Sequence, residues 1–164
     1  MTEEFIVKLF EHNNWANRKI VEACYALSND QLDTEPQSAT RGTIRRTVLH
    51  LVHSQKGYLS LVTMPVDERI DVAPTFEELL DSVNSSGQGL LALARGEGAS
   101  LDSRLQTKDG FYTEPWVVML QVINHATEHR EQIKSMLSAQ GVTPPDIDGW
   151  DYGEATNALI PISK

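Results

Sequence analysis

The sequence is poor in three features that would each have pointed to a particular class of protein. It has one cysteine, Cys24, in 164 residues, which excludes an internal disulfide and a metal site built from several thiolates. No segment approaches the ~20 apolar residues of a membrane-spanning helix, and the N-terminus lacks the apolar run of a secretion signal. We therefore expect a single domain over residues 1–164, with no membrane partner and a cytoplasmic location.

Clusters of basic residues are also missing. The formal net charge is −9, and the most basic grouping is the pair Arg45-Arg46. Binding to nucleic acid depends on Lys and Arg concentrated in one place, because they must neutralise phosphates. We therefore expect no nucleic-acid partner.

Apolar residues that recur at helical spacing predict four long helices. They cover residues 2–27, 43–63, 75 to about 95, and 115–140. Thr43 is placed to cap the second helix, and Pro115 suits the first turn of the fourth. Gly141 stands where a left-handed residue would end that helix. The predicted fold class is therefore all-α.

The third and fourth helices are joined by a long connection. Asp109-Gly110 separates two short runs that favour extended structure, and Asp-Gly is a strong hairpin signal. The sequence therefore predicts a four-helix bundle with a long crossover connection, in which about residues 101–114 form either a short hairpin or an extended loop.

Histidines on two of the predicted helices give the strongest functional signal. His125 and His129 are four residues apart, so both project from one face of the fourth helix. His50 lies on the flank of the apolar stripe of the second helix, whereas His53 points away from it. We predict that His50, His125 and His129 bind a metal ion at a seam between helices. The alternative is that the histidine pair belongs to a solvated face.

Other polar residues fall on apolar faces. Asn13 and Asn17 share the apolar face of the first helix, and buried amides need hydrogen-bond partners. They are candidates for contacts behind the metal ligands or with substrate; a structural hydrogen bond to a neighbouring helix is the alternative. Arg130 lies on the apolar stripe of the fourth helix, where we expect it to pair with a carboxylate or with backbone carbonyls. The same stripe includes Trp116 and Leu120.

Several motifs together carry a resemblance to a known family. They are Asn14–Asn17, Thr43–Leu51, Asn124–Ile133 and the Gly141–Tyr152 tail with its Pro-Pro and Trp-Asp-Tyr sequences. In this order they resemble the DinB-like (DNA-damage-inducible) family over nearly the whole chain. The resemblance implies a four-helix bundle with one long crossover, a three-histidine metal site that maps onto His50, His125 and His129, and a homodimer. It also implies kinship in fold with thiol-dependent transferases and isomerases.

The ligand set limits the chemistry. Three imidazoles on a divalent ion leave an open position, as in catalytic sites. Zinc is the expected ion, with nickel, iron and manganese as alternatives that imidazole also suits. Activation of water would give a hydrolase, and activation of a low-molecular-weight thiol would give an S-transferase or isomerase. The resemblance favours the thiol-dependent reaction on a small-molecule substrate. No residue is identified as a general base.

Two further functions compete with this prediction. The chain could be a non-catalytic bundle that binds a metal or a small ligand. Alternatively, His125-x-x-Glu128-His129 matches the inverzincin peptidase pattern, in which Glu128 would act as the base. The second is less favoured because few residues follow the motif to build a substrate cleft.

Overall fold

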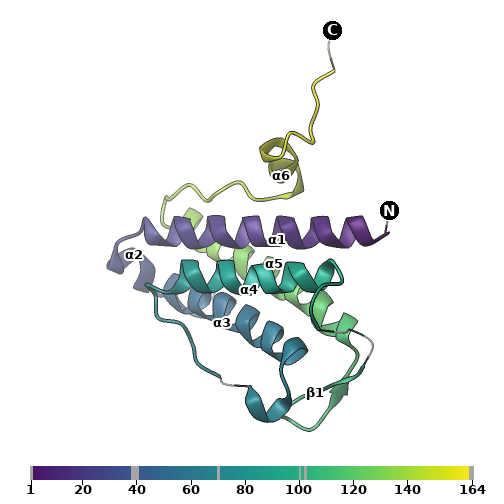
Figure 1. Ribbon diagram of the computed structural model, residues 1–164. Helices are drawn as coiled ribbons and strands as arrows, with labels where there is room; N and C mark the ends of the chain where they lie inside the picture. Colours follow the sequence, from purple (N-terminus) through teal and green to yellow (C-terminus); the bar gives the residue numbers. More distant parts are fainter. Residues whose placement is uncertain (1, 38–40, 70, 100, 102, 163–164) are drawn as a thin grey trace.

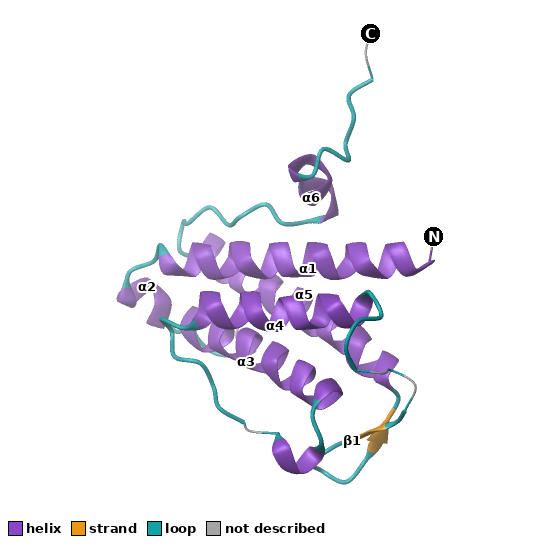
Figure 2. Ribbon diagram, in the orientation of Figure 1, coloured by secondary structure: helices purple, strands orange, loops and turns teal. Residues whose placement is uncertain are grey.

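The computed structural model describes residues 2–37, 41–69, 71–99, 101 and 103–162. This part of the chain is mostly helical, as predicted (Figure 2). The elements in order are α1 (Thr2–Tyr25), α2 (Asn29–Asp33), α3 (Ile44–Thr63), η1 (Val66–Glu68), α4 (Leu79–Ala94), β1 (Leu105–Gln106), β2 (Tyr112–Thr113), α5 (Pro115–Ala139) and α6 (Gly149–Ala155).

Local signals set the ends of the two helices that carry the histidines. The hydroxyl of Thr43 caps α3 by accepting a hydrogen bond from the backbone N–H of Arg46, at 3.3 Å. Helix α5 begins with Pro115, whose missing N–H costs nothing in a first turn. Gly141 follows its end with a φ of +72°, a left-handed conformation that glycine adopts without strain. These three predictions are confirmed.

The predicted start of α4 was wrong by four residues. The backbone N–H of Thr75 does donate to the carboxylate of Glu78, at 2.8 Å, which is half of a capping box. The helix nevertheless begins only at residue 79. The hydroxyl of Tyr25, at the end of α1, accepts the N–H of Leu80 at 3.1 Å. A contact with another helix therefore satisfies the first turn of α4.

The crossover between α4 and α5 contains the predicted hairpin. Strands β1 and β2 pair antiparallel, with Leu105 opposite Thr113 and Gln106 opposite Tyr112. Gly110 lies in the connecting turn with a φ of +92°, as the Asp-Gly signal requires. Residues 100 and 102 of the predicted connection lie outside the described residues.

The four long helices pack closely. Helix α1 lies against α4 and α5, and α3 lies against the same two helices (Figure 1). Gly87 permits close approach of α4 to α1, because a Cβ there would lie 2.7 Å from the side-chain oxygen of Asn14. The side-chain nitrogen of Asn14 donates to the carbonyl of Gly87 at 2.8 Å.

Two apolar clusters fill the interior. One gathers Ala16, Ile20, Val48, Leu51, Val83, Ile133 and their neighbours, and the other gathers Phe10, Val62, Leu90, Val118, Val122 and theirs. Along α1, α3 and α4, buried polar residues fall between members of the two clusters: Asn13, Gln55 and Ser86 respectively. The core is thus divided by a buried polar layer.

The first turns of α5 depart from the prediction. Trp116 and Leu120 were assigned to the buried stripe, yet they are 65% and 51% exposed. Periodicity places both on the apolar side of the helix, but within the described residues no neighbouring helix covers them. The apolar residues of α5 that are buried are Pro115, Val118, Met119, Val122, Ala126, Ile133 and Leu137.

After α5 the chain crosses α1 and forms α6 before projecting away (Figure 1). Tyr152 of α6 packs on the rings of His12 and Trp15, and the Nε2 atom of His12 lies 2.9 Å from the carbonyl oxygen of Ile147. The tail therefore packs back onto α1 through Tyr152, while Trp150 is 73% exposed.

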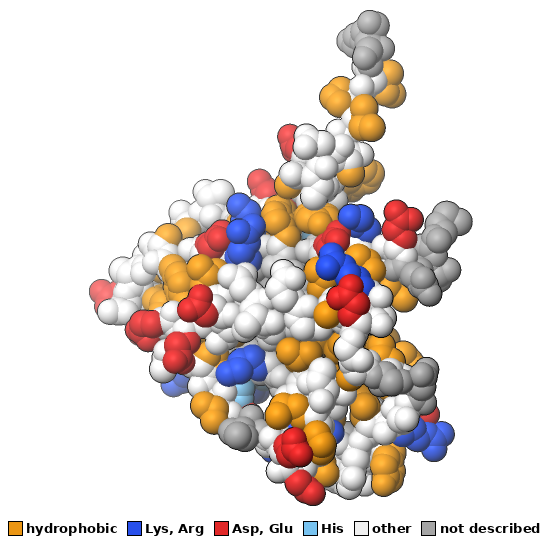
Figure 3. Space-filling model, in the orientation of Figure 1, with side chains coloured by type: hydrophobic (Ala, Val, Ile, Leu, Met, Phe, Trp, Pro, Cys, Tyr) orange, Lys and Arg blue, Asp and Glu red, His pale blue; other side chains and the backbone are white. Residues whose placement is uncertain are grey.

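The surface carries charged side chains of both signs. Acidic and basic side chains are interspersed on the face shown in Figure 3. Within the described residues, no helix has both the length and the apolar character needed to cross a membrane.

Candidate metal centre

The three predicted histidines meet between α3 and α5. The Nε2 atom of His125 lies 3.0 Å from that of His50 and 3.1 Å from that of His129. One nitrogen from each ring fits within a span of 4.8 Å. Four-residue spacing puts two of the rings on one face of α5, and the packing of α3 against α5 brings the third to them.

A hydrogen bond orients His129. Its Nδ1 atom lies 2.8 Å from the side-chain oxygen of Gln132, one turn along the same helix. An amide oxygen only accepts, so Nδ1 donates and Nε2 keeps its lone pair. Metal-ligating histidines usually donate their other ring N–H to such a partner. This tautomer aims a ligand atom into the cluster.

His50 has two neighbours on the opposite side of its ring. The Nη2 atom of Arg41 lies 3.1 Å from Nδ1 of His50, and the hydroxyl of Ser54 lies 3.5 Å from the same nitrogen. The edge of the Tyr58 ring packs against His125, with 5.6 Å between centroids. Among the described residues, the side chains of Arg41, Ser54 and Tyr58 thus border the cluster.

The nitrogens of the cluster do not satisfy one another. The Nε2 atom of a neutral imidazole carries one proton or one lone pair in the ring plane. His125 therefore cannot form full hydrogen bonds with both neighbours at 3.0 and 3.1 Å. A cation bound by three lone pairs removes this conflict. Tetrahedral zinc with Zn–N bonds of about 2.0–2.1 Å would hold its nitrogens about 3.3 Å apart, close to the 3.0 and 3.1 Å that separate His125 from His50 and from His129. The donor set fits a divalent metal ion.

Burial keeps two of the rings neutral. The pKa of His50 is lowered to about 4; the main cause is desolvation by burial, and the second is the positive charge of Arg41 nearby. The pKa of His125 is also lowered to about 4, mainly by desolvation on burial and next by the proximity of His129. His129 itself is only 7% exposed. Neutral imidazoles at physiological pH are the form that binds metal.

The two asparagine candidates belong to a different polar group. The guanidinium of Arg130 donates to the side-chain oxygens of Asn13 at 2.8 Å and Asn17 at 2.6 Å, and to the hydroxyl of Thr127 at 2.9 Å. Asn17 in turn donates to Gln55 of α3 at 2.7 Å. Both asparagines are buried, and each makes a hydrogen bond to a neighbouring helix; a contact with substrate stays a prediction.

The prediction for the partners of Arg130 was wrong. Its hydrogen-bond acceptors are amide and hydroxyl oxygens, whereas a carboxylate or backbone carbonyls were expected. Burial lowers the pKa of the Arg130 guanidinium to about 10, so it remains a cation at neutral pH. Arg130 is 4% exposed.

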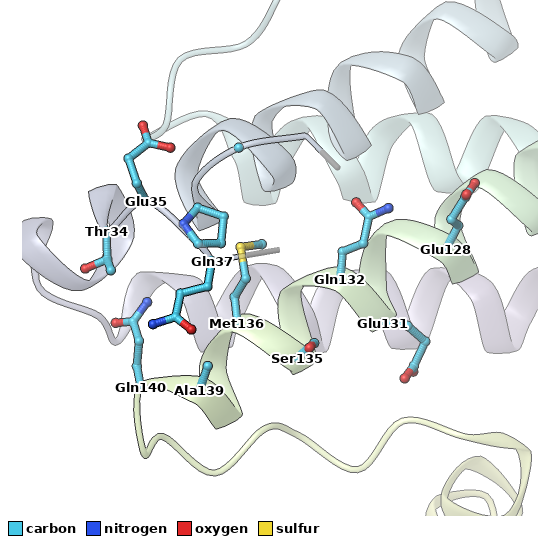
Figure 4. Close-up of a pocket in the computed structure, with 12 residues that line it drawn as sticks. Thr34, Glu35, Gln37, Glu128, Glu131, Gln132, Ser135, Met136, Ala139 and Gln140 are labelled. Atoms are coloured by element: carbon cyan, nitrogen blue, oxygen red, sulfur yellow. The ribbon is translucent and has the colours of Figure 1, made fainter. Parts of the chain in front are cut away.

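A cavity of about 660 Å³ is lined in part by Gln132, the hydrogen-bond partner of His129, but by none of the three histidines. Figure 4 shows Gln132, Ser135 and Met136 in succession on α5, opposite residues of the segment that follows α2. Glu128 is exposed and lines this cavity. The full lining is Thr34, Glu35, Pro36, Gln37, Gly42, Glu128, Glu131, Gln132, Ser135, Met136, Ala139 and Gln140.

The remaining histidines and the cysteine lie elsewhere. His53 lies 2.6 Å from the carboxylate of Asp71, and His12 contacts Ile147 and Tyr152 of the C-terminal tail. Neither belongs to the three-histidine group. Cys24 is fully buried, and burial raises the pKa of its thiol to about 12, as expected for a core residue.

Sequence reasoning missed two neighbours of the histidines. Gln132 was not among the predicted site residues, although its three-residue spacing from His129 places the two side chains on the same face of a helix. Arg41 stands outside any predicted helix, nine residues from His50. No periodic pattern could place it beside the cluster.

Comparison with known proteins identifies relatives. The sequence profile of the DinB family matches residues 1–162. The fold is similar to the crystal structure of a candidate member of the DinB family from Exiguobacterium sibiricum 255-15, with a TM-score of 0.66 and 17% identity over 85% of this chain and 91% of that one. No curated protein sequence matches the chain.

Proposed function

Because the chain belongs to the DinB family, we propose that it is a metal-dependent enzyme in which His50, His125 and His129 hold one divalent ion. The observation that carries this proposal is the convergence of three imidazole nitrogens that cannot satisfy one another through hydrogen bonds. Zinc is the proposed ion, and nickel, iron and manganese are alternatives.

We assign the scaffold to a four-helix bundle with a long crossover. The mutual packing of α1, α3, α4 and α5 supports this assignment, and the hairpin occupies the crossover. In such bundles, metal sites are built from side chains on facing helices. Here α3 and α5 are the facing pair.

The chain's own residues prepare the centre. Burial holds His50 and His125 in the neutral form, and the side-chain oxygen of Gln132 fixes the tautomer of His129. A divalent ion on three imidazoles supplies an open coordination position that acidifies a water or a thiol. The cavity beside Gln132 is large enough for a small molecule.

The reaction we favour is thiol-dependent transfer or isomerisation, in which a low-molecular-weight thiol attacks an electrophilic small molecule. Hydrolysis of a small molecule is the second candidate, because the same centre can activate water. The deeply buried thiol of Cys24 does not supply the nucleophile, so in the first case the thiol must come from a cofactor.

Metal content is the first test. Protein purified without an affinity tag or added metal should carry about one equivalent of a divalent ion. His50→Ala and His129→Ala should lose it. His53→Ala is the matched control, because His53 lies on the same helix as His50 and bonds Asp71 instead.

Activity is the second test. The metal-loaded protein is assayed with thiols and electrophiles together, and with hydrolysable esters and amides in the absence of thiol. If the wild type neither retains a metal nor binds added zinc at micromolar concentration, the proposal fails. If it binds metal but shows neither activity, the non-catalytic binding function replaces it.

A further inference from the structure

Arg41 makes a contact with the histidine cluster that conflicts with metal coordination. Its Nη2 atom lies 3.1 Å from Nδ1 of His50. Guanidinium nitrogens only donate hydrogen bonds, so Nδ1 must be the acceptor. A neutral imidazole that accepts at Nδ1 carries its proton on Nε2, the atom that faces His125. That nitrogen then has no lone pair to offer a metal ion.

Coordination through Nε2 reverses this arrangement. The proton of His50 moves to Nδ1, which becomes a donor and can no longer accept from Arg41. The hydroxyl of Ser54, 3.5 Å from Nδ1, is the nearby group able to accept the new N–H. The guanidinium of Arg41 is exposed, so it can leave the ring without becoming a buried, unpaired charge.

The position of Arg41 links this change to the cavity. The next residue, Gly42, lines the cavity together with Gln132, which orients His129. Arg46, one turn into α3, lies 3.7 Å from the carboxylate of Glu35, whereas Arg41 is directed at the histidines. A guanidinium released from His50 would therefore be available at a position that is next in sequence to a residue of the cavity lining.

We propose that Arg41 is an anion-binding residue whose availability is controlled by the metal. When His50 coordinates, Arg41 leaves Nδ1 and binds the carboxylate of a ligand that reaches the centre. This inference rests on the proposed metal site and adds a substrate class to it: a small molecule that carries a carboxylate near its reactive group. Guanidinium and carboxylate match in geometry and charge.

The tautomer of His50 is the direct readout. Long-range proton–nitrogen correlation spectra of histidine-labelled protein distinguish the two tautomers. After chelation of metal, His50 should carry its proton on Nε2 and His129 on Nδ1. After addition of zinc, the proton of His50 should appear on Nδ1.

Zinc affinity gives a second readout. Arg41→Met removes a competing hydrogen bond and a positive charge, so it should bind zinc about threefold to tenfold more tightly than wild type. Arg46→Met is the matched control, since it removes the same charge from a nearby exposed site that does not contact His50. Its zinc affinity should equal that of wild type.

Anion binding is measured on the zinc-loaded protein with 3-mercaptopropionate and its methyl ester. Wild type and Arg46→Met should prefer the free acid, and Arg41→Met should lose at least about threefold of that preference. Using the ratio of the two probes cancels the affinity of the thiol itself.

The outcomes separate this inference from the proposed function. If wild type binds no zinc, the metal centre fails and the role of Arg41 fails with it. If zinc binds but His50 keeps its proton on Nε2, or if Arg41→Met matches Arg46→Met in zinc affinity and in probe preference, the inference is overturned while the metal centre stands.

Discussion

Two groups of polar side chains lie side by side in this protein, and they use their hydrogen-bonding capacity in opposite ways. Arg130 gives its protons to oxygens of Asn13, Asn17 and Thr127. Its neighbour in sequence, His129, directs a nitrogen at the nitrogens of other histidines. In the first group the donors of Arg130 meet acceptor oxygens inside the chain, while the side-chain nitrogen of Asn13 is buried without a partner among the described residues. The second brings like groups together, an arrangement of ligand atoms that could hold a metal ion.

Neither group could have been assigned from burial alone. Arg130 and His129 are both almost fully buried, and both lie on α5. What separates them is the chemical character of their neighbours: neutral oxygens around one, and imidazole nitrogens around the other. Substitutions that remove one member of each group test this distinction.

The largest expected effect is on folding. Arg130→Leu would leave the oxygens of Asn13 and Asn17 without their donor in the interior, and each unsatisfied buried group costs about 1–3 kcal/mol. We expect the free energy of unfolding in urea to fall by about 3 kcal/mol. Arg18→Leu, at an exposed position on α1, serves as the control and should change it by less than about 0.5 kcal/mol. A loss below about 1 kcal/mol for Arg130→Leu would contradict a structural role.

The next effect is stabilisation by metal. Zinc at one hundred times its dissociation constant should stabilise the folded wild type by about 2.7 kcal/mol, because it binds the native state. The melting temperature should rise accordingly, and a chelator should reverse the rise. His129→Ala should show no shift, and His53→Ala should behave as wild type. An equal shift in all three proteins would place the bound metal elsewhere.

A smaller effect is expected at the group that orients His129. Gln132→Leu removes the acceptor of its Nδ1–H bond, and loss of such a partner typically weakens metal binding by about 10- to 100-fold. Competition against a chelator of known affinity measures this change. Gln121→Leu, at an exposed position on the same helix, should leave the affinity unchanged. Were the two variants alike, Gln132 would have no positioning role.

The smallest effect concerns the histidines without metal. His125→Ala in chelator-treated protein should change the free energy of unfolding by less than about 1 kcal/mol, because the ring is partly exposed and its nitrogen is poorly paired. Denaturation by urea measures it, with Arg130→Leu as the contrast. A loss as large as that of Arg130→Leu would show that the histidine cluster also holds the fold together.

The sequence was sufficient for the features that local chemistry decides. The cap at Thr43, the start at Pro115 and the stop at Gly141 each depend on residues within one turn of the helix end. The three histidines could be chosen because helical periodicity fixes which side chains share a face. Their meeting required only that two predicted helices pack along those faces.

Contacts between distant segments could not be predicted in this way. Tyr25 meets the start of α4 across 55 residues of sequence, and Arg41 approaches His50 from a segment with no periodic pattern. Trp116 and Leu120 failed for the complementary reason, because periodicity reveals an apolar face but not whether another helix covers it.

The polar layer also has a consequence for the dynamics of the fold. Hydrogen bonds run from Arg130 to Asn17, from Asn17 to Gln55, and from Gln55 to Ser86 at 2.7 Å, and so link α5, α1, α3 and α4. Opening one helix would leave a buried polar group on its neighbour without a hydrogen-bond partner. The free energy of local opening at this level is therefore almost as large as that of global unfolding. The backbone amides around these residues should therefore exchange with deuterium at one common, slow rate, while those of α6 exchange early.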